Sequence, residues 1–178
     1  TGSEQDGTPR IGDFSSGAAD GHRTAAEIMI LVGADVWKEY YTFAVERNPW
    51  EKVVSEFYWK LNIRDNALLS DEQNFENFVD NTLGKSYAPP TGWPIYTLDN
   101  EIIVDEIIQY KDLSNSFTSL FKDRFNIEVP KENFENTKKK SGRRKKHYTE
   151  LYVNNKYIDK IANLFSDEIK YFGYKFGD

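Results

Sequence analysis

The stretch from Tyr40 to Lys60 constrains the fold most, because it reads as a strand followed directly by a helix. Residues 41–45 are apolar and β-prone on both faces, which is typical of a strand covered on both sides in a parallel sheet. Asn48 suits a helix N-cap and Pro49 the first helical position. Apolar residues then recur at helical spacing to residue 61. The pattern predicts an α/β fold with a strand-to-helix junction.

Two side chains at this junction could bind an anion. Arg47 closes the predicted strand, and Ser55 lies seven residues after Asn48, two turns along the helix on the same face. A guanidinium presents a planar, permanently charged fork to phosphate oxygens. A hydroxyl and the amides of a helix start add further donors. The spacing therefore suits a phosphate site, although an ordinary surface arginine and an ordinary helix serine would give the same pattern.

The rest of the chain alternates helical patterns with one hairpin. Helices are predicted over residues 24–33, 36–40, 75–83, 113–125 and 158–172, and a hairpin over residues 95–104 around Asp99 and Asn100. Residues 107–110 either extend the hairpin or form a separate strand. Residues 1–21 are rich in Gly, Ser, Asp and Thr and show no apolar period, so we expect a flexible arm there. Residues 22–178 then form a single domain.

Composition excludes several classes of protein. Hydrophobic residues make up 39% of the chain, as in globular proteins, and no apolar run is long enough to span a membrane. The absence of cysteine excludes thiolate catalysis and thiolate metal sites and fits a reducing compartment, so we expect a cytoplasmic protein. Only two histidines are present, which argues against a multi-histidine metal site.

One basic run contrasts with the acidic remainder. The chain has a formal net charge of −6, yet no acidic residue lies between Asn136 and His147. The basic residues in this interval are Lys138, Lys139, Lys140, Arg143, Arg144, Lys145 and Lys146. A basic loop on an acidic body favours a local anion site over a general nucleic-acid surface. A non-catalytic module that docks a polyanion or an acidic partner through residues 138–146 remains the alternative.

The segment Arg47 to Ser55, RNPWEKVVS, resembles the 3′-phosphate-binding motif of sulfotransferases that use 3′-phosphoadenosine 5′-phosphosulfate (PAPS). Four further segments look like pieces of a bacterial-type branch of this family. They are GHRTAAE at 21–27, WPIYTLD at 93–99, HYTELY at 147–152 and FGYKF at 172–176. The resemblance thus covers residues 21–176. It implies a P-loop-NTPase-like α/β fold with a central parallel sheet flanked by helices.

The resemblance also implies roles for individual residues. Arg47 and Ser55 would hold the 3′-phosphate of PAPS, and Arg143 and Arg144 in the basic loop would close over the nucleotide. His22 precedes Arg47 by 25 residues and is the candidate base for a hydroxyl acceptor on a sugar or small alcohol. No metal, nucleic acid or membrane is implied. Trp93 and Tyr96 would either line the acceptor pocket or pack in the core.

One family element is not found. Sulfotransferases carry an N-terminal strand–loop–helix whose lysine holds the 5′-phosphosulfate, whereas residues 2–21 contain no lysine and follow no apolar strand. That element supplies the charge stabilisation that transfer most needs. We therefore expect an N-terminally truncated domain that binds nucleotide weakly and is inactive as it stands. A missing central strand would leave an apolar sheet edge that favours a homo-oligomer.

Overall fold

The computed structural model describes residues 23–64, 69–81, 83, 92–135 and 146–178. The predicted strand-to-helix unit is found there, and each segment predicted to be helical contains helix. In chain order the elements are α1 (Ala25–Val32), α2 (Ala34–Glu39), β1 (Phe43–Glu46), α3 (Pro49–Arg64), α4 (Asp71–Asn81), α5 (Trp93–Tyr96), β2 (Thr97–Leu98), β3 (Glu101–Ile102), β4 (Glu106–Gln109), η3 (Tyr110–Asp112), α6 (Leu113–Phe125), α7 (Lys131–Glu135), η4 (Tyr148–Leu151), α8 (Asn155–Leu164) and α9 (Ser166–Phe172).

The strands form two small pairs. β1 and β4 are parallel, with Phe43 opposite Glu106 and Glu46 opposite Gln109, so residues 106–109 form a separate strand. β2 and β3 form the predicted antiparallel hairpin. Its turn residues Asp99 and Asn100 both have positive φ, at 51° and 65°, as in a tight two-residue hairpin turn. The fold is thus a mixture of helices and a small sheet, compatible with the α/β class.

Two element predictions need correction. Residues 95 and 96 were predicted to begin the hairpin strand but lie in the short helix α5, which has a proline in its first turn. The Thr97 hydroxyl donates to the Trp93 carbonyl at 2.7 Å at the end of this turn. The helix predicted over 158–172 is two helices, because Phe165 has φ −109° and ψ 31°, outside the helical region.

The main core lies among helices rather than on the strand pair. Its buried members come from α3, α4, η4 and α8 with their flanking residues, and they include the predicted apolar stripe of α3 up to Tyr58. They are Trp50, Val53, Val54, Phe57, Tyr58, Phe75, Phe78, Val79, Tyr148, Leu151, Tyr152, Tyr157, Ile161 and Phe165. By contrast, Phe43 and Val45 on β1 are each 42% exposed. The expected two-sided cover of this strand is therefore wrong for the described residues.

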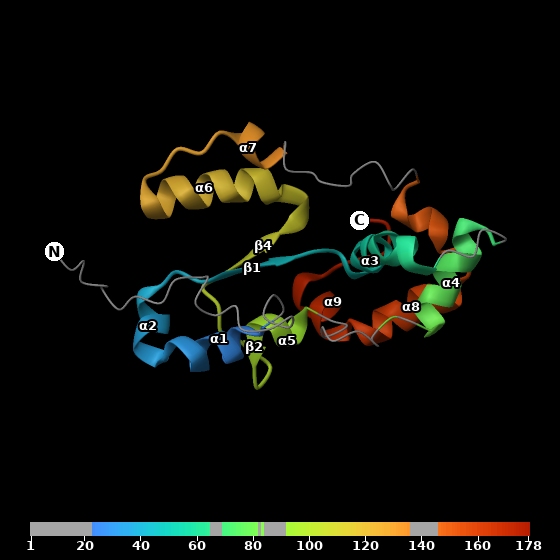
Figure 1. The fold of residues 1–178 in the computed structure, drawn as a ribbon, viewed down its shortest axis with the longest axis horizontal. Helices are drawn as coiled ribbons and strands as arrows, with labels where there is room; N and C mark the ends of the chain where they lie inside the picture. The colour runs from blue at the N-terminus through green and yellow to red at the C-terminus, as the bar shows by residue number, and fades with distance from the viewer. Residues whose placement is uncertain (1–22, 65–68, 82, 84–91, 136–145) are drawn as a thin grey trace.

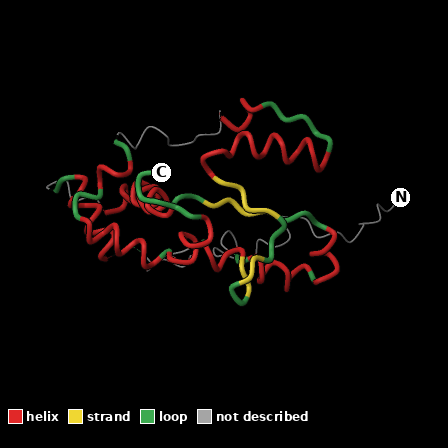
Figure 2. Tube along the Cα trace, turned by 180° about the vertical axis from the view of Figure 1, so that it is seen from behind, coloured by secondary structure: helices red, strands yellow, loops and turns green. Residues whose placement is uncertain are grey.

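The elements are arranged around the strand pair (Figure 1). α6 and α7 lie on one side of β1 and β4, and α1, α5 and the β2–β3 hairpin lie on the other. The view from behind shows the same arrangement (Figure 2). β1 runs towards the helical core and leads directly into α3, so the junction between them lies where strands and core meet. None of the described helices is both long and apolar enough to cross a membrane.

Candidate functional site

The junction between β1 and α3 is fixed by the side chain of Asn48. Its Oδ1 accepts hydrogen bonds from the backbone N–H groups of Trp50 at 3.1 Å and Glu51 at 3.5 Å. These are donors that the first turn of a helix otherwise leaves without partners. The Asn48 Nδ2 donates to the carbonyl of Lys175 at 3.1 Å, which links the junction to the C-terminal segment. The predicted cap is confirmed, and it fixes the backbone next to Arg47.

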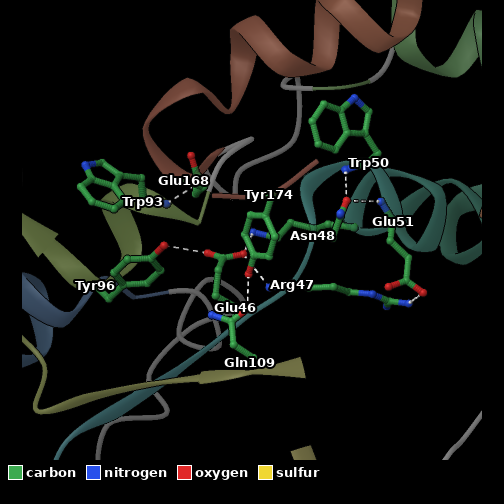
Figure 3. Close-up of polar contacts among 11 residues, drawn as sticks. Glu46, Arg47, Asn48, Trp50, Glu51, Trp93, Tyr96, Gln109, Glu168 and Tyr174 are labelled. Carbon is green, nitrogen blue, oxygen red and sulfur yellow. Dashed lines mark hydrogen bonds and ion pairs between the residues drawn. The ribbon is translucent and has the colours of Figure 1, made fainter. Parts of the chain in front are cut away.

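Arg47 extends from this junction along the first turn of α3 (Figure 3). Its Nη2 pairs with Oε1 of Glu51 at 2.7 Å, and its guanidinium carbon lies 4.3 Å from the centre of the Tyr110 ring. Its Nε is buried and has no hydrogen-bond partner among the described residues. Tyr110 directly follows β4, so the guanidinium lies beyond the carboxyl ends of two parallel strands. That edge is where α/β sheets bind ligands.

Ser55 is exposed on α3. Glu51 and Ser55 are four residues apart on α3 and therefore lie on the same side of the helix, and Glu51 pairs with Arg47, which precedes the helix. Glu51 thus links the two predicted phosphate contacts, of which Ser55 is exposed and the Arg47 side chain is 18% exposed. Their roles in binding stay predictions.

A buried carboxylate lies directly behind Arg47. Glu46 has no exposed surface, and its Oε1 accepts the backbone N–H of Arg47 at 2.8 Å. Its Oε2 accepts the hydroxyl of Tyr96 at 2.7 Å, and the Lys52 ammonium forms an ion pair with Oε1. A buried charge persists only when it is paired and hydrogen-bonded. Glu46 therefore connects the end of β1, the first turns of α3 and the helix α5.

A second buried acid lies in the same region. Glu168 of α9 is 1% exposed and accepts the backbone N–H of Trp93 at 3.0 Å. Burial raises the pKa of the Glu168 carboxyl, and the nearby Lys52 ammonium partly opposes that effect. Burial likewise raises the pKa of the Tyr96 and Tyr174 hydroxyls. The Tyr174 hydroxyl donates to Oε1 of Gln109, at the end of β4, at 2.5 Å.

The backbone of Gly92 packs closely against the buried ion pair of Glu46 and Lys52. A Cβ added there would lie 2.8 Å from the Lys52 Nζ and closer still to Oε2 of Glu46. The position therefore needs glycine because of close approach. Its φ of −77° and ψ of −23° would suit any residue.

The described residues include only part of the predicted site. Arg47 and Ser55 lie within the described residues, whereas His22, Arg143 and Arg144 lie outside them. Tyr96 packs in the core and donates to Glu46, which supports the core interpretation of that side chain. Sequence reasoning missed the buried pair Glu46 and Glu168. The available signal for Glu46 was an acid placed at the end of an apolar strand.

The end of the basic run makes a defined contact. Lys146 Nζ pairs with Oε1 of Glu72 on α4 at 2.7 Å, and this lowers the pKa of the Glu72 carboxyl to about 2. The N–H of His147 donates to Oε1 of Glu150 at 2.7 Å in a capping arrangement at η4. The chain is thus attached to the core directly after the basic run. No group of three potential metal ligands occurs in the part of the chain that the structure describes.

The fold and the site together are those of an α/β protein with an arginine at the carboxyl edge of a parallel strand pair, directly ahead of a capped helix. A family model described as the sulfotransferase family matches residues 20–175. The chain belongs to the sulfotransferase family. No curated protein and no solved structure matches it significantly. The family supports sulfuryl transfer as the general chemistry and confirms the resemblance seen in the sequence.

Proposed function

We propose that the chain belongs to an enzyme that transfers a sulfuryl group from PAPS to a hydroxyl group of a sugar or another small alcohol. The observation that carries this proposal is the setting of Arg47. Its guanidinium lies at the carboxyl edge of β1 and β4, with Nε buried and unpartnered among the described residues. The exposed Ser55 lies four residues after Glu51, the partner of Arg47, and the family match covers both positions. These features suit the 3′-phosphate of a nucleotide.

The proposed roles divide into binding and transfer. Arg47 and Ser55 hold the 3′-phosphate, and Arg143 and Arg144 contact the nucleotide from the basic loop. The acceptor oxygen forms a bond to sulfur while the bond between sulfur and the bridging phosphate oxygen breaks. The electron pair of that bond leaves with 3′-phosphoadenosine 5′-phosphate (PAP), and the hydroxyl proton passes to His22. The binding residues position the donor for this displacement and do not themselves react.

Binding of the nucleotide product PAP in the absence of an acceptor tests the proposed 3′-phosphate site. This test does not require the chain to catalyse transfer. In thermal unfolding, PAP should raise the Tm of the chain more than 5′-AMP does, because only PAP carries a 3′-phosphate. Arg47→Ala should remove that difference, whereas Arg124→Ala on α6 is the matched control and should preserve it.

An alternative outcome would identify a polyanion-binding module. In that case PAP, 5′-AMP and unrelated polyanions would stabilise the chain in proportion to charge. The effect would depend strongly on salt, and neutralising residues 138–146 would abolish it.

A further inference from the structure

The ion pair between Arg47 and Glu51 involves the guanidinium that the proposed function assigns to the phosphate. Glu51 is on the first turn of α3, midway in sequence between Arg47 and Ser55. Its Oε1 is 2.7 Å from the Arg47 Nη2, and its side chain is 24% exposed. A carboxylate and a phosphate offer a guanidinium the same geometry of paired oxygens. The carboxylate therefore takes an edge of Arg47 that a phosphate would use.

We infer that Glu51 is an internal competitor for the anion site, which the 3′-phosphate of the nucleotide displaces from Arg47 when it binds. This inference rests on the proposed function and adds a residue that sets its affinity. Three supports hold the guanidinium in place while the competitor leaves. The ring of Tyr110 stacks on it at 4.3 Å, and the cap by Asn48 together with the contact to Glu46 fixes its backbone.

The displacement has a defined electrostatic consequence. In the free chain Glu51 neutralises Arg47, so the local charge of the pair is zero. An incoming phosphate must replace one carboxylate contact and also approach a like charge. Glu51 thus weakens phosphate binding and leaves Arg47 paired when the nucleotide departs. A partly exposed ion pair of this kind is worth up to about 1 kcal/mol, which corresponds to a change in affinity of about two- to fivefold.

The test compares Glu51→Gln with Glu56→Gln. Both glutamates lie on α3, and Glu56 pairs with Lys60 at 2.5 Å just as Glu51 pairs with Arg47. In calorimetric titration, E51Q should bind PAP about two- to fivefold more tightly than the unmodified chain, and E56Q should not. Affinity for 5′-AMP, which has no 3′-phosphate, should be the same in E51Q and the unmodified chain.

Two further variants isolate the pair. In the Arg47→Ala background, E51Q should increase the affinity for PAP less than it does in the unmodified chain. The reason is that the guanidinium for which Glu51 and the phosphate compete is absent. Should E51Q fail to fold, Glu51→Asp keeps the charge but shortens the reach to Arg47. It should then give a smaller gain in PAP affinity.

Several outcomes would overturn the inference. Weaker or unchanged PAP binding by E51Q, while R47A still loses its preference for PAP, would leave the proposed function standing and remove the role of Glu51 as a competitor. An equal gain for 5′-AMP would show a general charge effect instead. Absence of any PAP preference in the unmodified chain would remove both the proposed function and the inference.

Discussion

Gly92→Ala probes the buried network behind Arg47. Backbone entropy predicts that the substitution stabilises the fold, whereas the close packing of the network predicts that it destabilises the fold. The backbone at Gly92 has φ −77° and ψ −23°, which alanine adopts freely. Judged by backbone entropy alone, the substitution should stabilise the fold by about 0.4–1 kcal/mol. The new Cβ would, however, lie 2.8 Å from Lys52 Nζ and closer to Glu46 Oε2. These contacts force the ion pair of Glu46 and Lys52 to move.

The expected cost follows from what the carboxylate would lose. Glu46 is fully buried, whereas Lys52 is 26% exposed and can shift towards solvent. Overpacking typically costs about 1–3 kcal/mol, and breaking a fully buried pair costs about 3–5 kcal/mol. With one flexible, partly exposed partner we expect a loss of about 3 kcal/mol in the free energy of unfolding. For a chain of this size that corresponds to a fall in Tm of about 6–12 °C.

Urea denaturation of a double-mutant cycle separates the causes. Glu46→Ala removes the carboxylate that the new Cβ meets, so Gly92→Ala in that background should cost under about 1 kcal/mol. An unchanged or raised stability of Gly92→Ala alone would refute the close packing of this network. If the losses in the free energy of unfolding caused by Gly92→Ala and Glu46→Ala were fully additive, the effect of Gly92→Ala would not arise from contact with Glu46.

Three further predictions test the same region. Tyr96→Phe removes the hydroxyl that donates to Glu46 at 2.7 Å, and urea denaturation should show a loss of about 1–3 kcal/mol; a loss below 0.5 kcal/mol would contradict the contact. Asn48→Ala removes the cap of α3 and should cost about 1 kcal/mol, whereas Asn48→Ser, which retains a capping oxygen and likewise lacks the amide that donates to Lys175, should cost less; equal losses would argue against the cap. Burial raises the pKa of Glu168 above 4.5, so the folded chain binds this proton more tightly than the unfolded chain. The stabilisation that protonated Glu168 adds to the free energy of unfolding is therefore fully present below pH 4.5. It is lost as the pH rises through the pKa of this group in the folded chain. Glu168→Gln should flatten that part of the profile of unfolding free energy against pH, and an identical slope in both proteins would be the contrary result.

The local signals in the sequence were sufficient for most helices. The capping box of Thr24 and Glu27 is present, with the Glu27 N–H donating to the Thr24 Oγ1 at 3.2 Å, and α1 ends before Gly33 as predicted. The cap at Asn48 and the hairpin turn at Asp99 are also found. Such features depend on neighbours in the chain, and for that reason a single sequence can show them.

Features that depend on tertiary contact could not be predicted in the same way. The pairing of β4 with β1 joins residues about 60 positions apart, and the sequence left residues 107–110 open. The burial of Glu46 and Glu168 arises from four separate segments that meet only in the fold. Phe43 and Val45 are partly exposed, although the strand was expected to be covered on both faces. An apolar side chain tends to be buried, but its sequence does not show whether another element packs against it. For Arg47, spacing indicated an anion site but not its pairing with Glu51.

The central claim is that Arg47 holds the 3′-phosphate of the donor nucleotide. Phosphorus nuclear magnetic resonance measures it most directly, because PAP gives separate signals for its 3′- and 5′-phosphates. Titration with the unmodified chain should shift or broaden the 3′-phosphate signal, and Arg47→Ala should abolish this effect. Perturbation of the 5′-phosphate alone, or a 3′-phosphate effect that survives in Arg47→Ala, would contradict the claim.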